Sequence, residues 1–120
     1  CYYNDAVKKG YSGTALFSRV KPASVITRLG WDPLDSEGRY TQADYKGLSV
    51  ISLYMPSGTS SEEALRKKLA FMEVFLEHMK ALRRGRREVI VCADWNICHQ
   101  PIDLKNWRAN QKNSGFLPEE

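Results

Sequence analysis

The sequence has no long apolar run. No uninterrupted apolar stretch of about eighteen residues occurs among its 120 residues, so we expect no membrane-spanning helix. The opening segment, CYYNDAVKKG, contains neither Met nor the apolar stretch of a signal peptide. Internal repeats and low-complexity segments are also absent. The composition, 42% hydrophobic and 27% charged, is typical of a soluble globular domain.

Cysteine is scarce, and no Cys-x-x-Cys spacing occurs. The spacing of the three cysteines, Cys1, Cys92 and Cys98, therefore makes a zinc site improbable. Their pattern favours reduced thiols of the kind found inside cells.

The net charge of +4 is concentrated in four arginines, Arg83, Arg84, Arg86 and Arg87. A basic cluster is compatible with a polyanionic partner. It is equally compatible with stabilisation of the C-terminal end of a helix dipole.

Alternating and β-branched segments predict strands in the first half of the chain, at residues 2–4, 14–20, 25–29, 39–45 and 48–54. The last two form a hairpin in which Gly47 occupies the tight position. The segment at 32–38 has the composition of a turn. Residues 88–93 are uninterruptedly apolar, which predicts a strand buried on both faces.

Apolar residues at helical spacing predict one long helix over residues 61–84. The apolar positions are Leu65, Leu69, Phe71, Met72, Phe75, Leu76, Met79 and Leu82. Ser60 and Glu63 have the spacing of a capping box, and we expect the apolar face to be core packing. His78 is expected to face solvent. Strands, a long helix and a buried strand together predict an α/β sandwich in which helices cover one or more sheets.

Asp94 and Asn96 directly follow the last predicted strand, where they would point the same way. A carboxylate there can act as a base or bind a hard metal ion, and an amide can stabilise an oxyanion. An Asx turn that ends the strand explains the same pair, and spacing alone favours the turn. Tyr54, at the end of another strand, could contact a phosphate or simply pack. His99 has no partner, which favours a structural role.

The segment at residues 103–116 combines three cations with three asparagines. This inventory suits phosphate contacts without base specificity. We expect Lys112 to contact nucleic acid here.

Four segments closely resemble the exonuclease III type of abasic-site (AP) endonuclease, within the endonuclease/exonuclease/phosphatase superfamily. They are GYSGTALFSR at 10–19, EGR at 37–39, LYMPSG at 53–58 and the block at 92–120. The resemblance implies a four-layer α/β sandwich, with two facing mixed sheets between outer helices. It also implies Mg²⁺-dependent (or Mn²⁺-dependent) hydrolysis of DNA 5′ to an abasic site, with 3′-end processing and 3′–5′ exonuclease activity.

Site roles follow from the same resemblance. Tyr54 is similar to the family's phosphate-contacting tyrosine and Asp94 to the carboxylate that orients or deprotonates the attacking water. Asn96 is similar to the amide that positions Asp94 and the phosphate. Residues similar to DNA-contacting positions are Tyr11, Asn106, Asn110 and Asn113. Trp95 and Trp107 depart from the family's usual Leu and Pro.

The family's metal-binding carboxylates and catalytic His correspond to positions outside this chain, and His99 does not match that His. We therefore expect residues 1–120 to be the central portion of a single domain, without a complete metal site and inactive or nearly so on their own. The expected partner of the intact protein is double-stranded DNA with abasic sites or damaged 3′ ends. We expect a monomer with no membrane partner, in the cytoplasm of a bacterium or in a eukaryotic nucleus.

Two other functions are open. Segments at 38–44, 55–58 and 105–108 also resemble relatives of the catabolite repression control type, which have lost the nuclease residues and act as RNA-associated regulators. A phosphatase of the wider superfamily is a third possibility. The presence of Tyr54, Asp94, Asn96, Asn110 and Asn113 together favours the nuclease, because a binding-only protein does not need the full set.

Overall fold

The structure, a computed structural model, describes residues 1–120. Its elements are, in chain order, β1 (Tyr2–Asp5), β2 (Gly13–Leu16), β3 (Ser24–Ile26), α1 (Asp32–Asp35), β4 (Tyr40–Tyr45), β5 (Leu48–Tyr54), α2 (Glu62–Arg84), β6 (Glu88–Asp94), the 3-10 turn η1 (Pro101–Asp103) and α3 (Trp107–Asn110). None of its helices is both long and apolar enough to cross a membrane.

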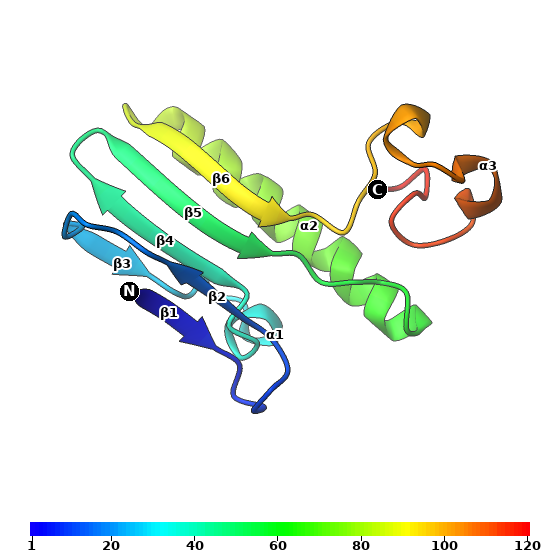
Figure 1. Cartoon of the computed structure of the whole chain (residues 1–120), viewed down its shortest axis with the longest axis horizontal. Coiled ribbons are helices and arrows are strands. Elements are labelled where there is room, and N and C mark those ends of the chain that lie inside the picture. The colour runs from blue at the N-terminus through cyan, green and yellow to red at the C-terminus, as the bar shows by residue number, and fades with distance from the viewer.

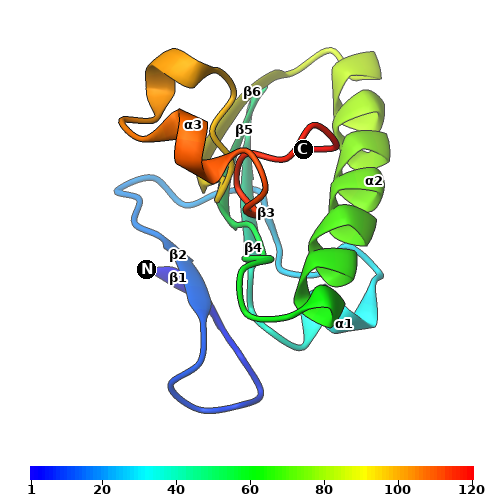
Figure 2. The same cartoon turned by 90° about the vertical axis from the view of Figure 1, so that its right-hand side faces the viewer.

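The strands form two sheets. One is mixed, with the order β3-β4-β5-β6, and only β5 and β6 in it are parallel; the other is the antiparallel pair β1-β2. Helix α2 covers one face of the four-stranded sheet, and the β1-β2 pair lies over the opposite face (Figures 1 and 2). The predicted α/β class, with two sheets and an outer helix, is confirmed.

The predicted hairpin is confirmed as β4 and β5. Tyr45 pairs with Leu48, and Gly47 has a φ of 73°, the left-handed conformation that glycine adopts without a steric penalty. Strand β1 extends one residue further than predicted, to Asp5, whereas β2 and β3 are shorter than predicted. Strand β2 ends at Leu16, and Phe17 beyond it is 84% exposed. The predicted turn at 32–38 begins with the single helical turn α1.

Helix α2 follows the prediction in extent, but its cap differs by one residue. Ser61, not Ser60, is the N-cap, and its hydroxyl accepts a hydrogen bond from the Ala64 N–H at 3.1 Å. This contact satisfies one of the free N–H groups of the first turn. Arg83 and Arg84 lie in the last turn, as the helix dipole favours.

The face of α2 that packs on the sheet is rotated from the one expected. Phe71 and Phe75 are buried, and so is the charged Lys68, whereas Leu76 is 54% exposed. His78 also belongs to the packed face, so the expectation that it faces solvent is wrong. The prediction used apolar residues alone, so it did not include Lys68 and His78, two polar residues that lie on this face. Phe71 and Phe75 join the main apolar core, which also contains Leu34, Tyr40, Ile51, Leu53 and Met55.

A polar chain runs beneath α2 along β4. His78 Nε2 lies 2.7 Å from the Tyr40 hydroxyl, which donates to Gln42, and the Gln42 amide donates to Asp44 at 2.8 Å. Burial, and then the charge of Asp44, raise the pKa of Tyr40 above its usual range. Because the single Tyr40 proton goes to Gln42, the imidazole must donate to the phenol oxygen. Burial lowers the pKa of His78, which therefore stays neutral.

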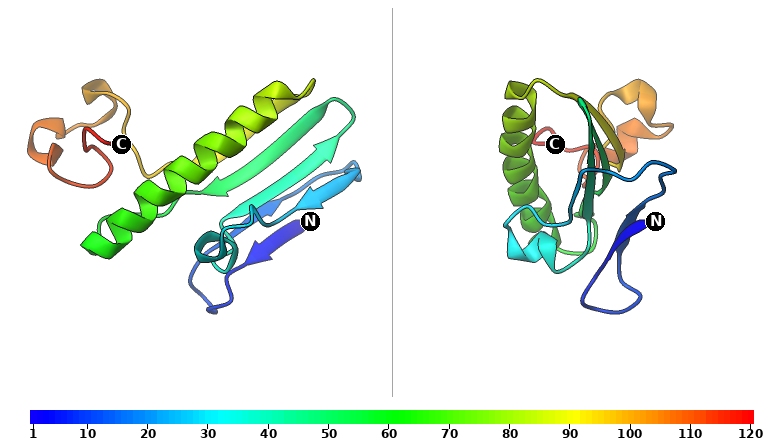
Figure 3. Two further views of the ribbon diagram at one scale, coloured as in Figure 1. Left: turned by 180° about the vertical axis from the view of Figure 1, so that it is seen from behind. Right: turned by 90° about the vertical axis from the view of Figure 1, so that its left-hand side faces the viewer.

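Strand β6 is not buried on both faces, contrary to the prediction. It is the edge strand of its sheet: Val91 packs against the core under α2, while Ile90, on the other face, is 50% exposed. Its apolar run reflects one packed face and one open face. The β1-β2 pair lies over the other half of the sheet (Figure 3).

The lowered pKa of His78 predicts a loss of stability in mild acid. The unfolded chain binds a proton near the ordinary His pKa of about 6.5, and the folded chain resists it, so the free energy of unfolding should fall as pH drops below that value. The slope contributed by one proton is at most about 1.4 kcal/mol per pH unit. Urea unfolding of the full-length protein between pH 5.5 and 7.5 would measure it. His78→Gln should flatten the slope and His99→Gln, at an exposed position, should not; an unchanged slope in His78→Gln would refute the assignment.

Candidate active site at the carboxyl ends of β5 and β6

The parallel register of β5 and β6 sets Tyr54 directly beside Asp94. Their preceding neighbours, Leu53 and Ala93, pack into the core under α2, so alternation places Tyr54 and Asp94 on the opposite face of the sheet. The Met55 N–H donates to the Asp94 carbonyl at 3.0 Å, which extends the pairing past the end of β5. A phenol and a carboxylate therefore meet at one open end of the sheet.

Asn96 closes a tight turn after Asp94. Its φ is 49°, a left-handed conformation that Asn tolerates better than most residues. Its N–H donates to Asp94 Oδ1 at 3.1 Å, and its side-chain amide donates to the Met55 carbonyl at 2.9 Å. The Asx turn considered from the spacing is thus present, but it engages one carboxylate oxygen only. Asp94 is exposed, so its other oxygen is available to solvent or to a ligand.

Arg39 joins Tyr54 to the distant Tyr11. Its guanidinium carbon lies 4.5 Å from the centre of the Tyr54 ring and 5.6 Å from the centre of the Tyr11 ring. Arg39 Nη1 also donates to the Tyr54 carbonyl at 3.3 Å. Stacking on one cation orders both aromatic rings. The structure thus brings together four of the predicted site residues: Tyr11, Tyr54, Asp94 and Asn96.

The Arg39 guanidinium is itself held by Glu37. Arg39 Nε lies 2.5 Å from Glu37 Oε2, and Lys67 of α2 pairs with the other carboxylate oxygen. Burial alone would raise the pKa of Glu37, but the hydrogen bonds and charges of Lys67 and Arg39 outweigh burial and hold it below its ordinary value. The carboxylate is therefore ionised at neutral pH and fixes Arg39 under the two tyrosines.

The asparagine-rich segment, residues 103–116, lies apart from this cluster. The Asn110 amide donates to the Asn106 carbonyl, and the Asn113 amide donates to Asn110 Oδ1, each at 2.9 Å. Asn110, Lys112 and Asn113 line a hollow together with residues 58–62, where α2 begins. No hydrogen bond joins them to Tyr54 or Asp94. Each amide keeps a second N–H free for a ligand.

The two unusual tryptophans both find packing partners. The Trp95 ring lies 6.0 Å from the Phe75 ring of α2, on the side of the sheet away from Asp94. The Arg108 guanidinium lies 4.7 Å from the Trp107 ring. Neither ring covers the Asp94 carboxylate, which is exposed. His99 lies on the exposed loop beyond Asn96 and has no hydrogen-bonding partner in the structure.

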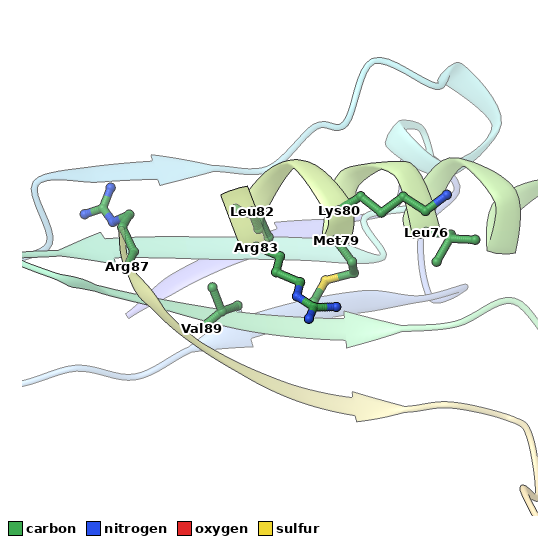
Figure 4. A pocket seen from close by; sticks show the side chains of 7 residues that line it. All are labelled: Leu76, Met79, Lys80, Leu82, Arg83, Arg87 and Val89. Atoms are coloured by element: carbon green, nitrogen blue, oxygen red, sulfur yellow. The ribbon is translucent and has the colours of Figure 1, made fainter. Parts of the chain in front are cut away.

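A separate pocket lies near the C-terminal end of α2. Its lining combines apolar and basic side chains: Leu76, Met79, Lys80, Leu82 and Arg83 of α2, Arg87, and Val89 of β6 (Figure 4). Arg87 donates to the Tyr45 carbonyl and lies 4.0 Å from Asp44, so part of the arginine cluster is committed to the fold. None of the residues that line this pocket belongs to the candidate site.

The residues present do not make a metal site. No group of three His, Cys, Asp or Glu side chains lies close enough together to hold a metal ion. A hard divalent cation such as Mg²⁺ needs several oxygen ligands in near-octahedral array, and Asp94 offers one carboxylate. All three cysteines are free thiols.

The profile of the Endonuclease/Exonuclease/phosphatase family matches residues 1–119. The chain belongs to this family. It is 40% identical over 119 residues to an exodeoxyribonuclease of Bacillus subtilis, across 99% of this chain. It is 34% identical over 113 residues to the DNA repair nuclease APEX1 of Danio rerio, across 94% of this chain.

A solved structure supports the same fold. An AP endonuclease from Archaeoglobus fulgidus superposes with a TM-score of 0.72 at 25% sequence identity, over 82% of this chain and 38% of its own. The chain spans 47% of the length of the B. subtilis protein and 36% of the D. rerio protein. It therefore corresponds to less than half of each of these relatives.

Two residues that hold the site, Arg39 and Lys68, have no signal in the sequence. Arg39 lies within the EGR segment, but nothing in the sequence showed that it would stack on Tyr11 and Tyr54. Lys68 lies on α2 among charged neighbours, and its burial has no local signal. The roles of both residues come from contacts with distant parts of the chain. Tyr54 lies fifteen positions from Arg39, and Asn96 lies twenty-eight positions from Lys68.

Replacement of Arg39 should destabilise the full-length protein even when the charge is kept. Arg39→Lys retains a cation for Glu37 but loses the planar group that stacks on both rings. We expect a loss of roughly 1–2 kcal/mol in the free energy of unfolding, and more for Arg39→Met. Urea unfolding would measure both, with Arg83→Lys at an exposed position as the matched control. Equal stability of Arg39→Lys and the parent would show that the stacking contributes nothing.

Proposed function

We propose that the intact protein is a DNA-repair nuclease of the exonuclease III type. In this proposal it hydrolyses the phosphodiester 5′ to an abasic site and processes damaged 3′ ends by 3′–5′ exonuclease action. The observation that carries the proposal is the pairing of Tyr54 with Asp94 at the open end of the sheet, with Asn96 in the turn that follows. Relatives named as an exodeoxyribonuclease and as a DNA repair nuclease support it.

The chemistry asked of Asp94 is general-base catalysis. The carboxylate orients a water molecule and takes its proton as the water oxygen attacks phosphorus. The bond from phosphorus to the 3′ oxygen then breaks, and that oxygen leaves and is protonated. The free oxygen of Asp94 suits this role, because its other oxygen is fixed by the Asn96 N–H and cannot swing away. A positioned carboxylate of this kind typically contributes about 10²–10⁴ in rate.

Tyr54 and Asn96 would contact the phosphate that reacts. The Tyr54 hydroxyl can donate to a phosphate oxygen, with its ring oriented by Arg39. The Asn96 amide retains one free N–H beside Asp94. Donors fixed in advance stabilise the charge that develops in the transition state without reorganising during the reaction.

DNA on either side of the reacting phosphate would be held without reading its sequence. Tyr11 reaches the site from the β1-β2 connection, with the Lys8 ammonium 5.3 Å from its ring. The loop after β6 offers further donors, three neutral and one charged: Asn106, Asn110, Asn113 and Lys112. Contacts of this kind position a duplex but carry no base information. An abasic nucleotide is the easiest to hold out of the stack, because no base must be unpaired.

The proposal includes a divalent cation, Mg²⁺ or Mn²⁺, in the intact protein. This chain alone does not supply its ligands, and we assign none within it. The proposal also describes a monomer that acts on duplex DNA, in the cytoplasm of a bacterium or the nucleus of a eukaryote.

Asp94→Asn is the direct test of the catalytic assignment. The substitution keeps the shape and the acceptor for the Asn96 N–H, and removes only the base. In the full-length protein, incision of a duplex with one abasic site should fall by about 10²–10⁴, while affinity for that duplex changes little. Single-turnover incision and fluorescence-anisotropy titration would measure the two effects.

Asp32→Asn, which alters an exposed carboxylate on α1, is the matched control and should retain parental turnover. Parental turnover in Asp94→Asn would remove the catalytic role from this residue. Tight binding of RNA with no cleavage of any duplex by the parent would instead favour the RNA-associated regulator.

Salt dependence should separate the neutral from the charged contacts on the loop. Asn110→Ala and Asn113→Ala should each weaken binding to an abasic duplex by roughly 0.5–1.5 kcal/mol, or 1.5–3 if the contact is to a charged phosphate. Neither should alter the slope of log affinity against log salt, because Asn releases no counterion. Lys112→Ala should reduce that slope by about 0.9. Titrations at several salt concentrations would show this; unchanged affinity in both Asn variants would mean that these amides serve only their own loop.

A further inference from the structure

Lys68 and Glu120 form an ion pair whose two side chains are entirely buried. Lys68 Nζ lies 2.5 Å from Glu120 Oε1, and both side chains have 0% exposure. The Lys68 ammonium has two further acceptors, the Asn96 carbonyl at 2.7 Å and the Ser114 hydroxyl at 3.3 Å. All three of its protons therefore have a partner.

Glu120 is equally well satisfied. Besides Lys68, it accepts from the Ser114 hydroxyl at 2.9 Å and from the N–H groups of Gly115 at 2.5 Å and Leu117 at 3.1 Å. Burial alone would raise its pKa, but these hydrogen bonds outweigh burial and hold the pKa below its ordinary value. The pair thus joins α2 to residues 114–120 at the C-terminal end of the chain.

The same ammonium also reaches the candidate active site. Asn96 is fixed at three points: its N–H by Asp94, its side-chain amide by the Met55 carbonyl, and its carbonyl by Lys68. The Cys98 N–H donates to the Gly115 carbonyl at 2.7 Å, so the segment that carries Glu120 is tied to the same turn. Of the three hydrogen bonds that hold Asn96, only the one from Lys68 comes from α2.

We propose that Lys68 and Glu120 are positioning residues for the turn formed by Asp94 and Asn96. The ammonium holds the Asn96 carbonyl, which keeps Asn96 in its left-handed conformation and its N–H on the Asp94 carboxylate. Glu120 holds the ammonium in place. The catalytic consequence rests on the proposed function, because it requires Asp94 to activate water.

The physical reason to look beyond stability is that a buried ion pair adds little net stability. The cost of removing both charges from water offsets most of their attraction, and an uncharged pair of the same size often serves as well. A geometric role, by contrast, is lost when the charge is removed. Stability and positioning can therefore be separated by replacing both partners at once.

The test uses the full-length protein that contains this chain, with the double substitution Lys68→Met and Glu120→Gln. Both replacements keep the side-chain volume, and Gln can still accept from Gly115 and Leu117. Three quantities are measured: the thermal midpoint, the hydrogen-exchange rate of the Asn96 backbone and side-chain amides by heteronuclear NMR, and single-turnover incision of an abasic duplex. Lys80→Met, on the same helix and half-exposed, is the matched control.

We expect the double variant to unfold near the parent's midpoint, the Asn96 amides to exchange faster, and incision to fall by about 10- to 100-fold, as for a small misplacement of a catalytic group. Affinity for the duplex should change by less than about two-fold, since no contact to DNA is removed. The Lys80→Met control should match the parent in all three.

Asn96 amides that exchange at the parental rate in a folded double variant would overturn the proposal, whatever the activity. If the parent itself fails to incise abasic duplexes, the proposed function fails, and the Asn96 amides still decide whether the pair positions the turn. If the double variant does not fold, Lys68→Arg, which keeps a buried cation and donor, replaces it: slowed incision with altered Asn96 exchange supports the proposal, and unaltered exchange refutes it.

Discussion

The arrangement of the candidate site depends on the register between the parallel strands β5 and β6. This register places Tyr54 opposite Asp94 and continues through the bond from the Met55 N–H to the Asp94 carbonyl. A shift by one residue would turn one of the two side chains into the core under α2. Parallel neighbours need a crossover connection, and α2 supplies it, so the long helix and the site are products of the same constraint. Chemistry at the carboxyl ends of strands is a common consequence of such connections.

Two polar side chains of α2, Lys68 and His78, are held by specific partners on the packed side of the helix. Lys68 and His78 occupy positions on α2 that apolar residues could fill, and each has a fixed partner: Lys68 binds Glu120 and the Asn96 carbonyl, and His78 binds Tyr40. Groups of this kind are costly to bury unless every donor and acceptor is used. The His78 contact ties α2 to β4, and the Lys68 contacts tie it to the segment that follows β6.

Local signals explain what could be predicted and what could not. The hairpin was predictable because Gly47 sits between two alternating segments, and α2 because its apolar residues recur at helical spacing. The buried face of α2 was misjudged because the apolar pattern takes no account of Lys68 and His78. Resemblance to a family suggested which residues form the site, but Arg39, which orders two of them, has no signature in its own neighbourhood. Its contacts come from residues far away in the sequence.

The measurement that bears most directly on the site is the footprint of DNA on the full-length protein. Amide chemical-shift mapping with an abasic duplex, in the presence of a chelator to prevent cleavage, would locate it. We predict perturbations at Tyr11, Tyr54 and residues 94–96, extending to the loop at 106–113. Perturbations confined to the pocket edged by Arg83 and Arg87, with the carboxyl ends of β5 and β6 unaffected, would contradict the assignment.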